Sequence, residues 1–178
     1  MRIIAGNRKG HKLKEFEGMN IRPTTDRVKE SMFNLIQDFI PGSNILDLFA
    51  GTGALSFEAL SRGAKYAVCT DLDVNSVKII KKNADELQFD NIEILNQDAM
   101  RFIKNSNSCF SVIFLDPPYN KGFIKPVIEA VLENELLEMD GIIVLESDNS
   151  DEHSEISGLD IIKQKRYGRT YVTVYQRR

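Results

Sequence analysis

The sequence predicts one α/β domain built on a doubly wound sheet, and three observations support this fold class. Short apolar segments of strand length recur along the 178 residues, at 44–50, 66–70, 92–95, 111–115 and 141–146. Segments with the apolar spacing of helices lie between them. A closing pair of strand-like segments, 159–165 and 170–176, meets at a tight turn over 166–169. Alternating strands and helices produce a parallel sheet, and the closing pair adds an antiparallel C-terminal strand.

The formal net charge of −3 conceals two basic ends on an acidic chain. Residues 1–14 contain five Lys and Arg residues and no acid, and residues 161–178 contain six and no acid. The remainder holds twelve basic residues and all twenty-six acidic ones. Basic ends indicate a polyanionic partner, although solvated terminal charge is the commoner origin of any single basic cluster.

The two cysteines, Cys69 and Cys109, lie in or beside apolar segments, without Cys-x-x-Cys spacing and with only two histidines in the chain. They are expected to be buried or inert thiols, so the sequence supports neither a disulfide framework nor a metal site. No apolar run is long enough to span a membrane, and the N-terminus lacks the apolar region of a signal peptide. We therefore expect a soluble, cytoplasmic protein with a single domain over 1–178.

Two elements precede the first strand of the sheet. A short apolar start, two glycines and interleaved cations are typical of a small basic β-hairpin. This hairpin is expected within an N-terminal extension, 1–20, ahead of the core of the domain, 21–178. A helix follows, which Thr24 or Thr25 can cap, and its apolar face is expected to continue until the chain reaches Pro41.

The most informative stretch is Asp116, Pro117, Pro118 and Tyr119, which follows the apolar segment 111–115. A near-continuous apolar strand is typical of the centre of a parallel sheet, and two prolines cannot extend it, so Asp116 is expected at the strand's carboxyl end. Ligands of open α/β sheets bind outside these ends. The carboxylate and a proline carbonyl can accept the hydrogens of an exocyclic amine, while Tyr119 stacks on the ring that bears it. Alone, the tetrapeptide fits a surface turn equally well.

Three other carboxylates lie at the ends of predicted strands: Asp47 within the end of the first, and Asp71 and Asp98 after the second and third. Asp47 precedes a loop in which Gly51 and Gly53 allow a ligand to approach the backbone closely. Asp71 lies twenty residues after Gly51, the spacing at which an acid accepts hydrogen bonds from a ribose. Asp98 is delivered to the same edge, where it can accept from an adenine amine. The Gly-x-Gly pair by itself is weak evidence, because many tight turns share it.

Several motifs together resemble known enzymes. The Asp-x-Phe-Ala-Gly-Thr-Gly loop at 47–53, the acids after strands two and three, and Asp-Pro-Pro-Tyr look like those of S-adenosylmethionine-dependent amino-methyltransferases of the seven-stranded class. Arg-Ile-Ile-Ala-Gly at 2–6, Arg-Pro-Thr-Thr-Asp-Arg-Val-Lys-Glu at 22–30 and Ala-Leu-Ser-Arg-Gly at 59–63 further resemble the bacterial small-subunit ribosomal RNA guanine-N2 methyltransferases. The resemblance covers nearly the whole chain, and the segment 22–30 is far more specific than the glycine loop.

The resemblance implies a Rossmann-like, seven-stranded class I methyltransferase sheet, and methyl transfer from S-adenosylmethionine to the exocyclic N2 amine of a guanine in small-subunit (16S) ribosomal RNA. It implies cofactor contacts from Asp47, Phe49, Gly51, Gly53, Asp71, Leu72, Asp98 and Ala99. The target guanine, once out of its stack, is expected to be held by Asp116, Pro117, Pro118 and Tyr119. The RNA is expected to contact Arg2, Arg8, Lys9, Lys12, Arg22, Thr25, Arg27, Lys165, Arg166 and Arg169. No metal is expected. The RNA is expected within an assembling or assembled 30S particle, and the protein is expected to act as a monomer.

The topology adds an expectation about the basic ends. Because the last strand runs antiparallel, the turn at 166–169 is expected at the catalytic edge, and Arg177 and Arg178 at the opposite edge. We therefore expect the cations around the turn to hold RNA phosphates and the final two arginines not to. Deleting residues 1–14 is expected to weaken RNA binding and its salt dependence while leaving cofactor affinity largely intact.

Three other functions fit parts of the pattern. A DNA adenine-N6 methyltransferase shares the chemistry, but the chain has no sequence-reading domain. A nicotinamide dehydrogenase shares the glycine loop and Asp71, yet the chain lacks a second domain and Asp-Pro-Pro-Tyr has no role in such an enzyme. A noncatalytic RNA-binding or assembly protein can keep the same fold, although an intact Asp116 argues against this alternative.

Overall fold

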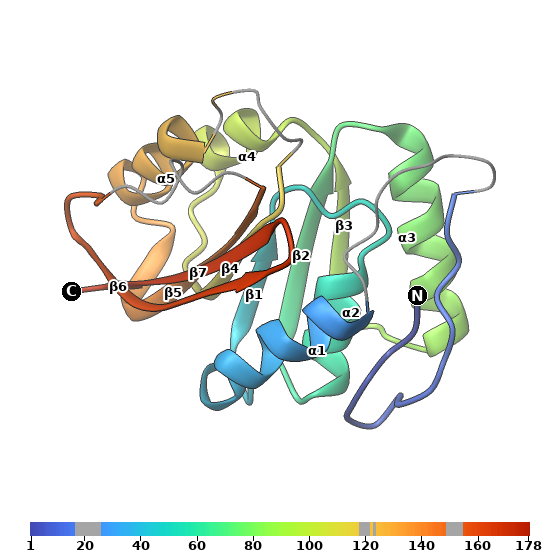
Figure 1. Cartoon of the computed structure of the whole chain (residues 1–178). Helices are drawn as coiled ribbons and strands as arrows, with labels where there is room; N and C mark the ends of the chain where they lie inside the picture. Colours follow the sequence, from blue (N-terminus) through green and yellow to red (C-terminus); the bar gives the residue numbers. More distant parts are fainter. Residues whose placement is uncertain (17–25, 118–121, 123, 149–154) are drawn as a thin grey trace.

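A computed structural model of the chain describes residues 1–16, 26–117, 122, 124–148 and 155–178 (Figure 1). The strands within these ranges are β1 (Asn44–Asp47), β2 (Tyr66–Asp71), β3 (Ile92–Asn96), β4 (Phe110–Leu115), β5 (Leu137–Ser147), β6 (Leu159–Tyr167) and β7 (Thr170–Arg177). The helices are α1 (Asp26–Leu35), α2 (Ala54–Ser61), α3 (Val74–Leu87), α4 (Ala99–Asn105) and α5 (Ile124–Glu133), with a short 3-10 helix, η1 (Gln37–Phe39).

All seven strands form one sheet in the order β3-β2-β1-β4-β5-β7-β6. The first five in this order are parallel, whereas β7 pairs antiparallel with both β5 and β6. The predicted sheet with an antiparallel C-terminal strand is therefore confirmed. From β1 the chain adds β2 and then β3 on one side, whereas β4 and β5 are added on the other side, so the order of the strands reverses between β1 and β4. A ligand crevice is therefore expected outside the carboxyl ends of these two strands.

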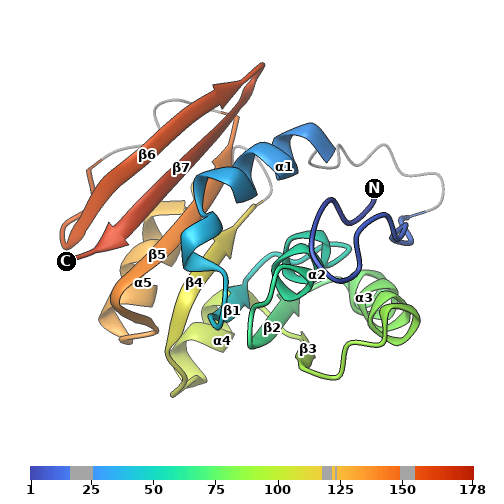
Figure 2. The same cartoon turned by 90° about the horizontal axis from the view of Figure 1, so that it is seen from below.

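Helices cover both faces of the sheet, as a doubly wound fold requires (Figure 1, Figure 2). The helices α1, α2 and α3 pack on one face, and α4 and α5 on the other. Phe33 of α1 packs against Phe114 of β4 with 5.6 Å between ring centroids. Because β4 is buried on both faces, its residues read as the continuous apolar run that marked it in the sequence.

Four local differences separate the predicted from the observed elements. The helix that begins the core ends at Leu35, because Ile36 leaves helical geometry and η1 continues the apolar spacing as a 3-10 turn. β1 ends at Asp47, since residues 48–50 leave the ladder to form the loop, with Leu48 and Ala50 still buried. β5 begins earlier than predicted, at Leu137, because a register shift opposite β4 accommodates Asp140 with a positive φ inside the strand. The short helix α4 had no strong apolar period and was not predicted.

The N-terminal extension returns on itself as predicted, and within its described residues, 1–16, a single bridge pair, Arg2 with Lys12, forms between its two sides. Ile3 and Leu13 point into the core and are almost completely buried. Residues 17–25, the remainder of the extension and the start of the predicted helix, lie outside the described residues. The described part of the extension is thus packed onto the domain and does not project from it (Figure 1).

A buried carboxylate on α2 fastens this extension. Glu58 is fully buried and accepts hydrogen bonds from the backbone N–H groups of Ile4 at 2.8 Å and Ala5 at 3.1 Å. It also pairs with Arg62 at 2.7 Å and with Lys29 of α1 at 3.2 Å. Burial lowers the pKa of Lys29, and the charge of Glu58 opposes this effect. Glu58 therefore joins the extension, α1 and α2 at one point.

Candidate active site

The carboxylate at the end of β1 is buried but incompletely hydrogen-bonded. Asp47 is 1% exposed, and the hydroxyl of Ser56 donates to its Oδ2 at 2.9 Å. Within the described ranges no group donates to Oδ1, although this oxygen is buried. Burial raises the pKa of Asp47 to about 7, the Ser56 hydrogen bond lowers it, and the negative charge of Asp71 raises it further. A cationic ligand group at Oδ1 would satisfy this oxygen and stabilise the carboxylate.

Asp71, at the end of β2, shapes the glycine loop. Its Oδ2 accepts the N–H of Gly51 at 2.8 Å, and its Oδ1 accepts the N–H of Asp73 at 2.9 Å. Gly51 and Gly53 both have positive φ, at 55° and 78°. A Cβ on Gly53 would lie 2.7 Å from the ring of Phe57, whereas a Cβ on Gly51 would meet no atom within 4 Å. The loop therefore leaves open space at Gly51, where a ligand can reach the backbone.

An exposed apolar platform follows Asp71. Leu72 is 72% exposed and Val74 51% exposed, which is unusual for large aliphatic side chains directly after a buried strand. The side-chain amide of Asn96, at the end of β3, donates to the carbonyls of Asp71 and Leu72 and fixes this stretch. Leu72 thus offers a held apolar surface on which a flat ligand ring can pack.

Asp98 has a structural role besides its predicted one. It precedes α4, and its Oδ1 accepts the N–H of Arg101 at 3.0 Å as the N-cap of that helix. The side chain is exposed at the same edge of the sheet as Asp71, and Ala99, the next residue, is buried as the first residue of α4. The contact of Asp98 with an adenine amine stays a prediction.

Asp116 lies directly after β4, half-buried, and Pro117 is buried behind it. The register pairs Asp47 of β1 with Phe114 of β4, so Asp47 and Asp116 end neighbouring strands at the switch point of the sheet. The half-buried Phe49 follows Asp47 in the same loop. The structure thereby brings Asp47, the glycine loop and Asp116 to one edge. Two further predicted residues, Pro118 and Tyr119, lie outside the described residues.

These residues fit S-adenosylmethionine. The unsatisfied Oδ1 of Asp47 suits an ammonium group, and the carboxylate of Asp71 suits ribose hydroxyls. The exposed Leu72 suits the face of an adenine, and Gly51 leaves room for close approach of the methionine part. The fit rests on donor chemistry and open space that the protein itself provides.

The cations of the N-terminal extension differ in how the protein uses them. Arg2 pairs with Asp26 at 3.4 Å, and Arg8 donates from Nε to the carbonyl of Leu87 at 2.7 Å while its guanidinium lies over Phe89. Lys9 and Lys12 are exposed. The RNA contacts predicted for Arg22 and Thr25 fall outside the described residues.

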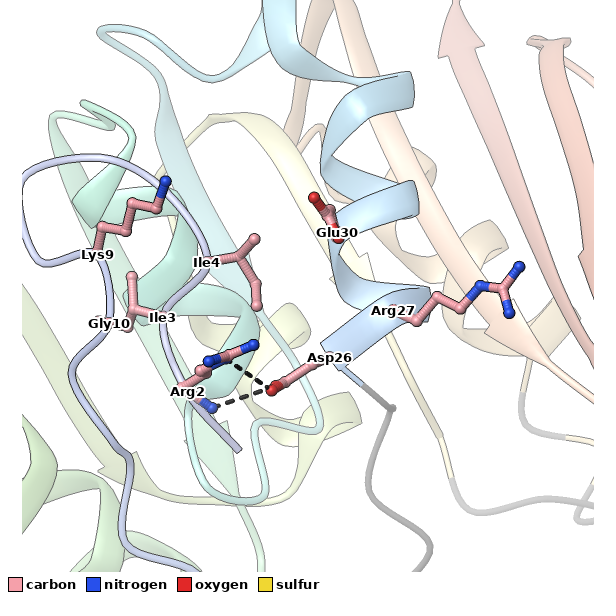
Figure 3. A pocket seen from close by; sticks show the side chains of 8 residues that line it. All are labelled: Arg2, Ile3, Ile4, Lys9, Gly10, Asp26, Arg27 and Glu30. Carbon is pink, nitrogen blue, oxygen red and sulfur yellow. Dashed lines mark hydrogen bonds and ion pairs between the residues drawn. The ribbon is translucent and has the colours of Figure 1, made fainter.

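A pocket of about 470 Å³ separates the extension from the start of α1 (Figure 3). Arg2, Lys9 and Arg27 contribute cations to its lining, and Asp26 and Glu30 contribute carboxylates. Arg27 points away from Arg2 in this view (Figure 3).

The β6–β7 hairpin carries the C-terminal cations to both edges of the sheet. Ser147 pairs with Tyr171, so the turn that follows Tyr167 lies at the carboxyl edge of β5, as the topology predicted. Arg166 there lies over the ring of Tyr171 at 5.3 Å, near the exposed Lys165 and Arg169. The two terminal arginines lie at the opposite edge, where Arg177 donates to Leu137 and Arg178 pairs with Asp160.

Sequence reasoning missed the polar residues that support this site, chiefly Ser56 and Asn96. Ser56 lies in α2, whose residues are all buried, and a polar residue in such a helix is itself a signal. Asn96 is the last residue of β3, two positions before the expected acid, but nothing local indicates that its amide reaches β2. Both residues hold others in place and make no predicted ligand contact.

A family model described as "Conserved hypothetical protein 95" matches residues 1–176. The chain belongs to this family. It is 39% identical to "Putative rRNA methyltransferase YlbH" of Bacillus subtilis over the full length of both chains. It is 36% identical to "Ribosomal RNA small subunit methyltransferase D" of Haemophilus influenzae, over 99% of this chain and 93% of that relative. The family resemblance indicated by the motifs is confirmed.

The fold of the family is equally clear in solved structures. The structure titled "Putative methyltransferase yhhF from Escherichia coli" superposes with a TM-score of 0.91 at 33% identity, covering 99% of this chain and 97% of that one.

In the part of the chain that the structure describes, no helix combines the length and apolar character needed to cross a membrane. Nor do three His, Cys, Asp or Glu side chains in those ranges gather as ligands of a metal ion.

Proposed function

We propose that this protein transfers a methyl group from S-adenosylmethionine to the exocyclic N2 amine of a guanine in small-subunit (16S) ribosomal RNA. The observation that carries the proposal is the placement of two carboxylates at the ends of neighbouring strands, at the switch point of the sheet. One of them, Asp47, has a buried oxygen that no group in the described ranges satisfies, and the other, Asp116, opens an Asp-Pro-Pro-Tyr segment. Relatives named as small-subunit ribosomal RNA methyltransferases support the choice of RNA.

On this proposal the residues around β1 and β2 hold the cofactor. Asp47 binds its ammonium group, Asp71 accepts from the ribose hydroxyls, and Leu72 packs on the adenine whose amine Asp98 accepts. Phe49, Gly51, Gly53 and Ala99 complete the walls. When bound, S-adenosylmethionine supplies an electrophilic methyl group attached to a cationic sulfur.

Asp116 and the proline carbonyls act on the target base. The guanine N2 lone pair is delocalised into the ring, which makes the amine a poor nucleophile. Asp116 and a carbonyl of the Pro117-Pro118 segment each accept one amine hydrogen and direct the lone pair outward. Tyr119 stacks on the ring and orients it. The surplus proton leaves to Asp116 or to water.

The basic residues hold the RNA, which we propose is presented by an assembling or assembled 30S particle to a monomer of this protein. The hairpin turn lies at the edge that carries Asp116, and its cations are exposed, whereas the terminal arginines lie at the opposite edge. Replacing the turn cations by Gln should reduce RNA affinity and its salt dependence, and replacing Arg177 and Arg178 should not. Filter binding at several salt concentrations measures both; equal losses would contradict the assignment.

The test of the reaction is methyl transfer from labelled S-adenosylmethionine to small-subunit particles from cells that lack the gene. Wild type is compared with Asp116→Ala and with Asp90→Ala, which changes an exposed aspartate after α3. The expected product is N2-methylguanosine at one site, formed by wild type and Asp90→Ala and not by Asp116→Ala. Transfer to DNA, or no transfer to particles, naked RNA or DNA despite cofactor binding, would overturn the choice of substrate.

A further inference from the structure

A single buried side chain on α3 contacts both the glycine loop and the N-terminal extension. Asn83 is 1% exposed. Its Oδ1 accepts the N–H of Lys14 at 2.8 Å, and its Nδ2 donates to the carbonyls of Lys14 and Thr52, each at 3.2 Å. Asn83 thus pairs with both backbone groups of Lys14, as a neighbouring strand would, and bonds the loop with its remaining donor.

Thr52 is the middle residue of the glycine loop that the proposed function assigns to the cofactor. Its neighbours, Gly51 and Gly53, both have positive φ and, as glycines, tolerate many other backbone conformations. The N–H of Gly53 bonds to Ala50 within the loop at 2.7 Å, and external hydrogen bonds help to define the rest of its shape. Asp71 supplies one such bond at Gly51, and Asn83 supplies another at Thr52.

The extension has further attachments on the same helix. Lys14 pairs with Glu86, and Arg8 donates to the carbonyl of Leu87 at 2.7 Å. Figure 1 shows the extension running beside α3, whose first turn follows the Asp71 and Leu72 end of β2. These contacts fasten the extension to the helix, and Asn83 hydrogen-bonds to both the extension and the glycine loop.

We propose that Asn83 is a positioning residue that couples the glycine loop to the N-terminal extension. A ligand that orders the loop also orders the Thr52 carbonyl, which strengthens the hold of Asn83 on Lys14. By reciprocity, RNA bound to the extension through Lys9 and Lys12 tightens the loop around the cofactor. The proposal rests on the proposed function, because it takes the loop to be the cofactor site. It replaces the expectation that loss of residues 1–14 leaves cofactor affinity intact.

Hydrogen exchange of the wild-type protein tests the coupling without any substitution. S-adenosylhomocysteine, the demethylated cofactor, should slow exchange of the Lys14 amide, which donates to Asn83. It should also slow the Leu13 amide, which bonds within the extension to the carbonyl of Met1. If the compound binds and neither amide responds, the coupling is refuted while the cofactor assignment stands. If it does not bind at all, both are refuted.

Two variants separate positioning from mere support. Asn83→Leu has similar size but cannot bond Thr52, so S-adenosylhomocysteine should bind about fivefold more weakly, the effect of losing roughly one hydrogen bond, and the Leu13 amide should no longer respond to it. Glu86→Gln removes a different, exposed attachment of Lys14 and should leave both the affinity and the response unchanged. A purely structural Asn83 would raise exchange at Leu13 equally with and without the compound and leave its affinity unchanged.

Discussion

Replacing Asp47 with Asn should stabilise the ligand-free protein near pH 8 and abolish strong cofactor binding. The Asp47 carboxyl is almost completely buried, and burial raises its pKa from 3.8 to about 7. A difference of about three pH units corresponds to about 4 kcal/mol, which is the cost of keeping the ionised group folded above pH 7. An Asn amide avoids this cost. It leaves one donor unsatisfied at the former Oδ1, however, and this penalty cancels roughly 1–3 kcal/mol of the gain. The net gain expected at pH 8 is about 1–3 kcal/mol.

The sign of the pH dependence follows from proton binding. Between about pH 3.8 and about pH 7 the unfolded chain has lost the Asp47 proton and the folded chain still holds it. The folded state binds more protons there, so the free energy of unfolding of the wild type falls as pH rises through this range. Above about pH 7 the wild type bears the full cost of ionising Asp47, and below about pH 3.8 it bears none. The advantage of Asp47→Asn should therefore grow from about zero near pH 5 to its full value near pH 8.

The same carboxylate should make cofactor binding depend on pH. An ammonium group at Oδ1 requires the anion, so below pH 7 the wild type must release a proton to bind. Affinity for S-adenosylhomocysteine should then fall by about tenfold for each pH unit below 7, and Asp47→Asn should bind weakly at every pH. Calorimetric titration and urea unfolding between about pH 5.5 and about pH 8.5 measure both effects. A wild-type affinity that is constant through pH 7, or a variant less stable than wild type at pH 8, would refute the reasoning.

Two further substitutions test the buried cluster and the apolar platform. Glu58→Gln leaves Lys29 buried without its anion and should cost about 3–5 kcal/mol in urea unfolding. Burial lowers the pKa of Lys29, so keeping it protonated in the folded protein costs stability. The difference in unfolding free energy between Glu58→Gln and wild type should therefore narrow as pH rises and Lys29 loses its proton. Glu86→Gln, at an exposed pair, should cost less than about 1 kcal/mol, and an equal loss in both would contradict a special role for Glu58. Leu72→Ala should change the free energy of unfolding by less than about 0.5 kcal/mol because Leu72 is 72% exposed. It should nevertheless weaken the binding of S-adenosylhomocysteine about tenfold. An unchanged affinity would show that Leu72 does not belong to the site.

The strand ends of this site could be predicted from sequence because a strand that is buried on both faces is apolar at consecutive positions. β4 is apolar at every position but one, so the polar residue that follows it had to lie at an edge. The order of strands then places Asp47, Asp71 and Asp116 together without any knowledge of side-chain contacts. The placement of the hairpin turn followed from the antiparallel direction of β7 in the same way. These predictions depended on topology, which local patterns determine well.

The supporting contacts could not be predicted, because they join segments far apart in sequence. Glu58 reaches Ile4 across 54 positions and Asn83 reaches Lys14 across 69, and neither pair shares a local periodicity. The one accessible signal was Glu58 itself, a charge within a helix whose other residues are mostly small or apolar. A buried charge requires partners, but the sequence does not say which backbone will supply them.

Charge counting in particular cannot separate cations that serve the fold from cations that face a partner. The basic N-terminus suggested an RNA surface, yet the guanidinium of Arg8 packs over Phe89 and bonds Leu87. Lys29, on the helix α1 that follows the extension, is fully buried against Glu58. The cations left exposed, Lys9 among them, are carried on a segment that Glu58 and Asn83 anchor to the core. An anchored basic segment loses less entropy on meeting a polyanion than a free tail, so on the proposed function the contacts that remove some cations from the surface would improve RNA binding by those that remain.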